Sequence, residues 1–155
     1  MLIEKKLRVS GRIMTVGILG GLYSGLLMAS YVPFPGKIEV KVVSVDTPSE
    51  ITVSYETWPG FARNTAINLP GLEIPEDTPQ ADDCEREKAA RALAFTRQFI
   101  DKAKKVFVKD MRMETSASEQ AYSDIITNKG SLSQALKTAG LARSDTVPHE
   151  TSWCR

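Results

Sequence analysis

The chain has few histidines and cysteines, the residues that bind zinc through nitrogen or sulfur. Its 155 residues include one histidine, His149, and two cysteines, Cys84 and Cys154. These residues lack the spacing of a zinc site, no glycine-rich loop connects a predicted strand to a predicted helix, and no nucleophile motif is present. His149 lies beside Pro148 in a polar tail, where solvation is a simpler interpretation than catalysis.

An excess of positive charge is also lacking beyond the N-terminal segment. Four of the 20 basic residues and one of the 19 acidic residues precede residue 13, which leaves 16 basic and 18 acidic residues. Nonspecific nucleic-acid binding requires Lys and Arg to neutralise phosphates, so a net charge of −2 argues against nucleic acid as a partner. The length, with 42% hydrophobic residues, fits one globular domain and a short appendage.

Residues 13–32 contain no charged side chain. A helix of this length crosses about 30 Å of hydrocarbon, and the basic residues before it place 1–12 in the cytoplasm. The sequence therefore predicts a single span in a bacterial inner membrane, with a domain over 37–155 on the periplasmic side. The alternative is a cleaved signal peptide with a site near Ala29 and Ser30, although the apolar stretch exceeds the roughly 7 to 15 residues of a signal core.

The expected span carries small residues at every fourth position: Gly17, Gly21, Gly25 and Ala29. A face of this kind lets another helix approach closely. Transmembrane helices of other membrane subunits are therefore the expected partners, although glycine is also common in membrane spans in general.

The remaining chain predicts an α+β domain. Five segments rich in β-branched residues indicate strands, namely 37–45, 51–55, 66–69, 106–108 and 122–127. A helix is predicted over 80–105, and a second helix follows a capping box at 131–134 and ends at Gly140. Its buried stripe is expected to consist of Leu132, Ala135, Leu136 and Ala139.

Two further sets of side chains have expected roles. Cys84 and Cys154 form a pair in a domain assigned to an oxidising compartment, so a disulfide is predicted; two unpaired thiols are the alternative. Tyr55, Trp58 and Phe61 are expected to pack in a barrel, with an aromatic binding surface as the alternative.

In this order, the segments resemble the staphylococcal nuclease-like (thermonuclease) family. Residues 67–76, INLPGLEIPE, are similar to its V-R-L-x-G-I-D-A-P-E segment, and Cys84, Glu87 and Ala90 to a C-x-x-E-x-x-A helix start. Residues 130–142 and 152–154 are similar to the G-x-S-L…G-L-A and S-W-C endings. The resemblance implies a five-stranded OB-type β-barrel with two to three packed helices, preceded here by one transmembrane helix.

Active members of this family use two aspartates that hold calcium, a glutamate, and two arginines that stabilise the developing charge. In this chain Ser49 replaces one aspartate and Glu73 the other, Asn68 and Gln120 occupy the arginine positions, and Glu76 keeps the glutamate. Each lost charge-stabilising donor costs about 2.7 to 4 kcal/mol of transition-state stabilisation. The resemblance therefore implies a pseudoenzyme without a bound metal or other cofactor.

The preferred hypothesis is a noncatalytic structural or interaction subunit of an inner-membrane protein complex, with protein partners in the periplasm. One alternative is a membrane-tethered calcium-dependent nuclease whose metal site is rebuilt from Asp46, Glu73 and Glu76. Another is an OB-fold module that binds nucleic acid or carbohydrate.

Overall fold

The computed structural model describes residues 31–114, 120–146 and 152–154. Within these ranges, no helix combines the length and the apolar composition of a membrane span. Tyr31 and Val32, at the end of the expected span, belong to a strand. The folded domain thus begins before the expected residue 37, because this strand pairs with the end of another strand up to residue 114.

Several predictions concern residues outside the described ranges. They are the span over residues 13–30, its small-residue face and the solvated histidine, that is, Gly17, Gly21, Gly25, Ala29 and His149.

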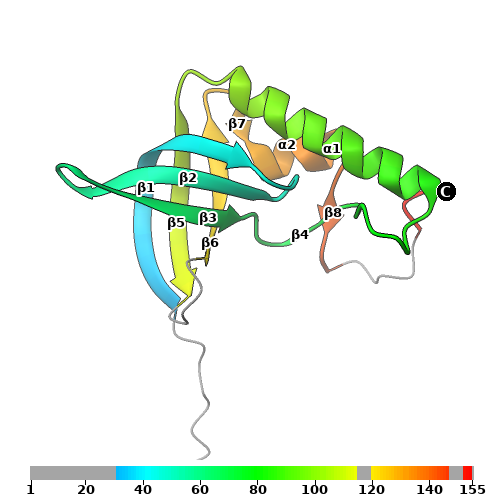
Figure 1. Cartoon of the computed structure of the whole chain (residues 1–155), viewed down its shortest axis with the longest axis horizontal. Helices are drawn as coiled ribbons and strands as arrows, with labels where there is room; N and C mark the ends of the chain where they lie inside the picture. Colours follow the sequence, from blue (N-terminus) through cyan, green and yellow to red (C-terminus); the bar gives the residue numbers. More distant parts are fainter. Residues whose placement is uncertain (1–30, 115–119, 147–151, 155) are drawn as a thin grey trace, which may run out of the picture.

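Five strands form a closed barrel, as the sequence predicts (Figure 1). Antiparallel pairings give the order β3-β2-β1-β5-β6, and a parallel pairing between β3 and β6 closes the sheet. This is the strand order of an OB-type barrel. The strands are β1 Tyr31–Val45, β2 Glu50–Trp58, β3 Phe61–Asn68, β5 Val106–Glu114 and β6 Gln120–Thr127.

Strand β1 is long enough to serve two neighbours. It pairs with β5 up to Val40 and with β2 from Lys41 onward. A register shift after Phe34 coincides with Gly36, whose φ of +92° suits glycine and whose backbone N–H donates to Asp110 Oδ1 at 2.8 Å. Irregularities of this kind bend a strand and help a small sheet close on itself.

The barrel core follows the alternation of the strands. In β2 the side chains of Ile51, Val53 and Tyr55 are buried, while in β6 every second residue points inward, including the fully buried Ile125. Packing was therefore the right prediction for Tyr55.

Packing was the wrong prediction for the other two aromatic residues of this hairpin. Trp58 and Phe61 are 63% and 60% exposed. Figure 1 shows why: the β2–β3 hairpin extends beyond the body of the barrel, so no other element of the described ranges covers its tip.

Two helices lie beside the barrel, with α2 next to β6 and α1 alongside α2 (Figure 1). Helix α1, Asp83–Asp101, is shorter than the predicted 80–105 because the Asp82 side chain caps it by accepting from Glu85 N, and because the chain leaves the helix at Lys102. Its buried face contains Ala89, Ala92, Thr96, Phe99 and Ile100.

Helix α2, Leu132–Thr138, begins at the predicted cap, where Ser131 Oγ accepts from Gln134 N. Leu132 and Leu136 are fully buried, as expected. Ala139 is exposed instead, because it is the C-cap and no longer part of the packed face.

Three short strands were not predicted from the sequence. Strand β7, Gly130–Ser131, adds to β6, and β4, Leu72–Glu73, pairs with β8, Arg143–Ser144, in a separate two-stranded sheet. This small sheet fixes the segment after β3 to the chain that follows α2, and it forms one side of the candidate site.

Candidate functional site

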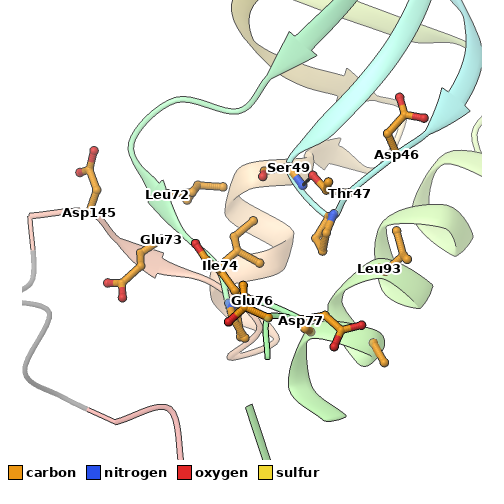
Figure 2. Close-up of a pocket in the computed structure, with 15 residues that line it drawn as sticks. Asp46, Thr47, Ser49, Leu72, Glu73, Ile74, Glu76, Asp77, Leu93 and Asp145 are labelled. Carbon is orange, nitrogen blue, oxygen red and sulfur yellow. Dashed lines mark hydrogen bonds between the residues drawn. The ribbon is translucent and has the colours of Figure 1, made fainter. Parts of the chain in front are cut away.

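Three of the five residues that the resemblance compares with the family's site residues come together at one pocket. Ser49, Glu73 and Glu76 belong to the lining of a cavity of about 690 Å³ (Figure 2). The cavity lies between the loop joining β1 to β2, the segment from β4 to residue 78, and three residues of α1, which are Ala89, Ala90 and Leu93.

The other two family positions do not line this pocket. Asn68 and Gln120 lie on the adjacent strands β3 and β6, where Asn68 pairs with Tyr122 and Gln120 with Ala66. Since both side chains are neutral, neither offers the charge that a guanidinium would bring.

The loop between β1 and β2 is held by its own hydrogen bonds. Thr47 Oγ1 accepts from Ser49 N at 3.3 Å and from Glu50 N at 2.9 Å. The carbonyl oxygen of Pro48 accepts from the hydroxyl of Thr96, a fully buried residue of α1, at 3.1 Å. The helix therefore fixes the loop that carries Ser49.

Asp46 is engaged within the same loop. One of its carboxylate oxygens, Oδ2, accepts from Ser44 Oγ at 3.1 Å and from Thr52 Oγ1 at 2.8 Å. Figure 2 shows its side chain well apart from those of Glu73 and Glu76.

On the opposite side of the pocket, the segment at β4 alternates. Leu72 and Ile74 point toward the loop, whereas the carboxylate of Glu73 points away from it (Figure 2). Glu73 accepts from Arg143 Nη2 at 2.6 Å and from Arg143 Nε at 2.8 Å. The two residues are partners in the β4–β8 register, and their side chains are only 17% and 19% exposed.

This ion pair affects the pKa of Arg143. The hydrogen bond to Glu73 raises the pKa of Arg143 above its ordinary value, against the lowering effect of burial. A two-pronged contact of this kind uses both carboxylate oxygens. The side chain at the second metal-ligand position of the family is therefore held by a guanidinium in this chain.

Arg143 also connects the site to the C-terminal residues. Its guanidinium lies 4.1 Å from the ring centroid of Trp153, and Lys88 of α1 donates to the backbone oxygen of Trp153. The next residue, Cys154, forms the predicted disulfide with Cys84 at the start of α1, with a Cα–Cα distance of 6.2 Å.

A three-carboxylate metal site built from Asp46, Glu73 and Glu76 does not form in the described part of the chain. There, the group of three potential ligand atoms within 4.8 Å of one another is Asp82, Cys84 and Cys154. Both cysteines of that group are in the disulfide and offer no thiolate. The rebuilt metal site expected of the tethered-nuclease alternative is thus not assembled.

The pocket lining is acidic. Among the described residues, it contains no Lys, Arg or His and has five carboxylates, from Asp46, Glu73, Glu76, Asp77 and Asp145. Across residues 31–146 with their gap at 115–119, Glu76, Asp77 and Asp145 make no side-chain hydrogen bond or ion pair. A phosphate anion entering this pocket would meet like charge without a compensating cation.

The sequence did not point to Arg143, Asp77 or Asp145. Arg143 directly follows the G-L-A residues 140–142, but nothing in the spacing of residues connects it to a glutamate 70 positions earlier.

A scan of the chain against models of protein families gives no match, and a search of the curated proteins gives none either.

Proposed function

We propose that this chain is a catalytically inactive relative of the staphylococcal nuclease-like proteins that works as an interaction subunit of a bacterial inner-membrane complex. The observation that supports this proposal is the cleft itself: Ser49, Glu73 and Glu76 line it together, and the described part of its lining has no cation. Glu73, which the resemblance compares with a metal ligand, forms an ion pair with Arg143 instead.

The chemistry of phosphodiester hydrolysis explains why this cleft is unsuited to it. The transition state gains negative charge, which a metal ion and cationic side chains stabilise. Two missing donors at about 2.7 to 4 kcal/mol each correspond to a loss of roughly 10⁴-fold to 10⁶-fold in rate. The acidic lining repels the substrate in addition.

Features of the sequence and the disulfide support the proposed place of the subunit. The uncharged stretch before residue 31 and the basic residues preceding it support an anchor with the domain on the periplasmic side. The disulfide between Cys84 and Cys154 suits an oxidising compartment. The small-residue face of the expected span supports packing against helices of other subunits.

Two measurements on the full chain test the proposal. In a nuclease assay with single-stranded DNA and calcium, the wild type is expected to cleave no faster than Glu76→Gln. After mild solubilisation, blue-native electrophoresis is expected to show the chain in an assembly much larger than its own 17.1 kDa. Calcium-dependent cleavage that Glu76→Gln abolishes, or migration as a lone monomer, would show that the proposal is wrong.

A further inference from the structure

The pocket has two kinds of lining that together indicate its occupant. Its floor is apolar and is made of side chains from the β4 segment and from α1, namely Leu72, Ile74, Pro75, Ala89 and Leu93. A volume of about 690 Å³ is in the range of sites that hold a ligand of several functional groups.

The rim carries the charge. Asp46 and Asp145 lie on opposite sides of the pocket in Figure 2, and Glu76 and Asp77 lie at its lower edge between them. These carboxylates do not converge on one point, since no three of them are within 4.8 Å of one another in the described part of the chain. Carboxylates spread in this way suit a long cationic ligand better than a single metal ion.

We propose, building on the function proposed above, that this pocket binds a segment of a partner protein in which a lysine or arginine lies beside an apolar residue. Lys and Arg bury their aliphatic stems on apolar surface while the charged head remains at a polar rim. The apolar neighbour occupies the floor at Leu72 and Ile74, and the cation meets the unpaired carboxylates of Glu76 and Asp77.

The same lining excludes other occupants on physical grounds. A phosphate or a nucleic-acid backbone would meet five carboxylates and, among the described lining residues, no cation. An acidic peptide would meet the same repulsion, and a purely apolar peptide would leave the carboxylates of the rim partly desolvated without a partner. A basic segment with an apolar residue satisfies both parts of the lining.

The proposal is tested with the full-length chain in detergent and three immobilised sets of nonapeptides. The first set has Lys or Arg beside Leu, the second has Glu beside Leu, and the third has Lys or Arg among serines. Binding to the first set and much weaker binding to the other two is the expected result. A fluorescent peptide from the first set then gives dissociation constants by anisotropy, with spermidine as a competitor.

Two variants with matched controls locate the site. Glu76→Gln with Asp77→Asn is expected to weaken peptide binding by about 2-fold to 30-fold, the range for two surface ion pairs. Its control replaces two exposed carboxylates of α1 outside the lining, Glu87→Gln with Asp101→Asn, and leaves binding unchanged.

A steric pair of variants on α1 is independent of charge. Ala90→Trp places a large side chain in the lining and is expected to abolish peptide binding, whereas Ala94→Trp, at an exposed position one turn further along α1, is not. Circular dichroism and thermal unfolding establish that each variant is folded.

The outcomes separate this inference from the function on which it rests. Equal binding of all three peptide sets, unchanged binding by the two lining variants, or spermidine binding as tight as that of the peptides overturns the inference. If the lining variants lose peptide binding and dissociate from the large assembly in blue-native gels, the inference is supported. An assembly that persists in every lining variant, with no peptide bound by the wild type, removes the inference and leaves the proposed function standing.

Discussion

Replacing Glu73 with glutamine tests whether this side chain is a structural partner of Arg143 or a ligand held ready for a metal. The change removes the negative charge from a two-pronged contact with distances of 2.6 and 2.8 Å. It leaves a guanidinium that is only 19% exposed facing a neutral amide. Removing one partner of a fully buried ion pair costs about 3 to 5 kcal/mol, and hydrogen bonds to charged groups contribute about 1.5 to 3 kcal/mol.

Because both side chains retain some exposure, we expect Glu73→Gln to lower the free energy of unfolding by about 1.5 to 3 kcal/mol. Urea unfolding with the disulfide intact measures this loss. A double-mutant cycle with Arg143→Met isolates the pairwise term, which is expected at about 0.5 to 3 kcal/mol for residues in contact. Glu87→Gln, an exposed change on α1, is the control and should stay within about 0.5 kcal/mol of the wild type.

Calcium supplies the contrary outcome. If Glu73 were free to bind the ion, calcium at a hundred times its dissociation constant would stabilise the wild type by about 2.7 kcal/mol. A wild type that calcium stabilises, together with a Glu73→Gln variant of unchanged stability that has lost this response, would refute the assignment of Glu73 to Arg143.

Three further changes test parts of the fold. Joint replacement of Cys84 and Cys154 by serine opens a loop of 70 residues and should cost about 4 kcal/mol on the chain-entropy model, measured as a lower urea midpoint; an unchanged midpoint would contradict a formed disulfide. Ile125→Ala, at a fully buried position of β6, should cost about 2 to 5 kcal/mol in the same assay, and a loss below about 1 kcal/mol would show that the side chain is not in the core. Gly140→Ala should cost about 1 to 2 kcal/mol in thermal unfolding, because φ is +68° there and no atom crowds the added methyl group; equal stability would mean that α2 ends differently.

The main elements of the fold could be predicted because their signals are local. Alternating β-branched residues marked the five barrel strands, and the cap at Ser131 and the glycine at 140 marked both ends of α2. The α2 end is a paired motif in which Gly140 N donates to Lys137 O and Leu141 N to Leu136 O, each at 3.0 Å.

The errors have two causes. The first is a local signal that was missed: the Asp82 side chain caps α1 by accepting from Glu85 N, and the chain leaves the helix at Lys102, so α1 spans Asp83–Asp101 instead of 80–105. The second cause is tertiary structure. Trp58 and Phe61 are large aromatic residues of the kind that fill protein cores, yet they lie exposed at the tip of a hairpin that extends past the barrel.

The sequence pointed to some residues of the site but not to others. The resemblance singled out Ser49, Glu73 and Glu76 from the order of segments along the chain, and these three residues line one pocket. Arg143 had no such signal: its role depends on the pairing of β4 with β8, two strands of two residues each that show no periodicity. The pairing of two such short strands depends on how the rest of the domain folds, not on a local pattern of residues.

The glutamate at position 73 and the arginine at position 143 depend on each other. The register of β4 and β8 places residue 73 opposite residue 143, and the contacts at 2.6 and 2.8 Å need a side chain long enough to present both oxygens to the guanidinium. An aspartate is shorter by one methylene group and would withdraw its carboxylate from this position. Arg143 in turn lies against Trp153, next to the disulfide that joins the C-terminal residues to α1. The carboxylate at a position that the resemblance assigns to metal binding thus helps to hold the C-terminal residues in place, because both of its oxygens accept hydrogen bonds from Arg143.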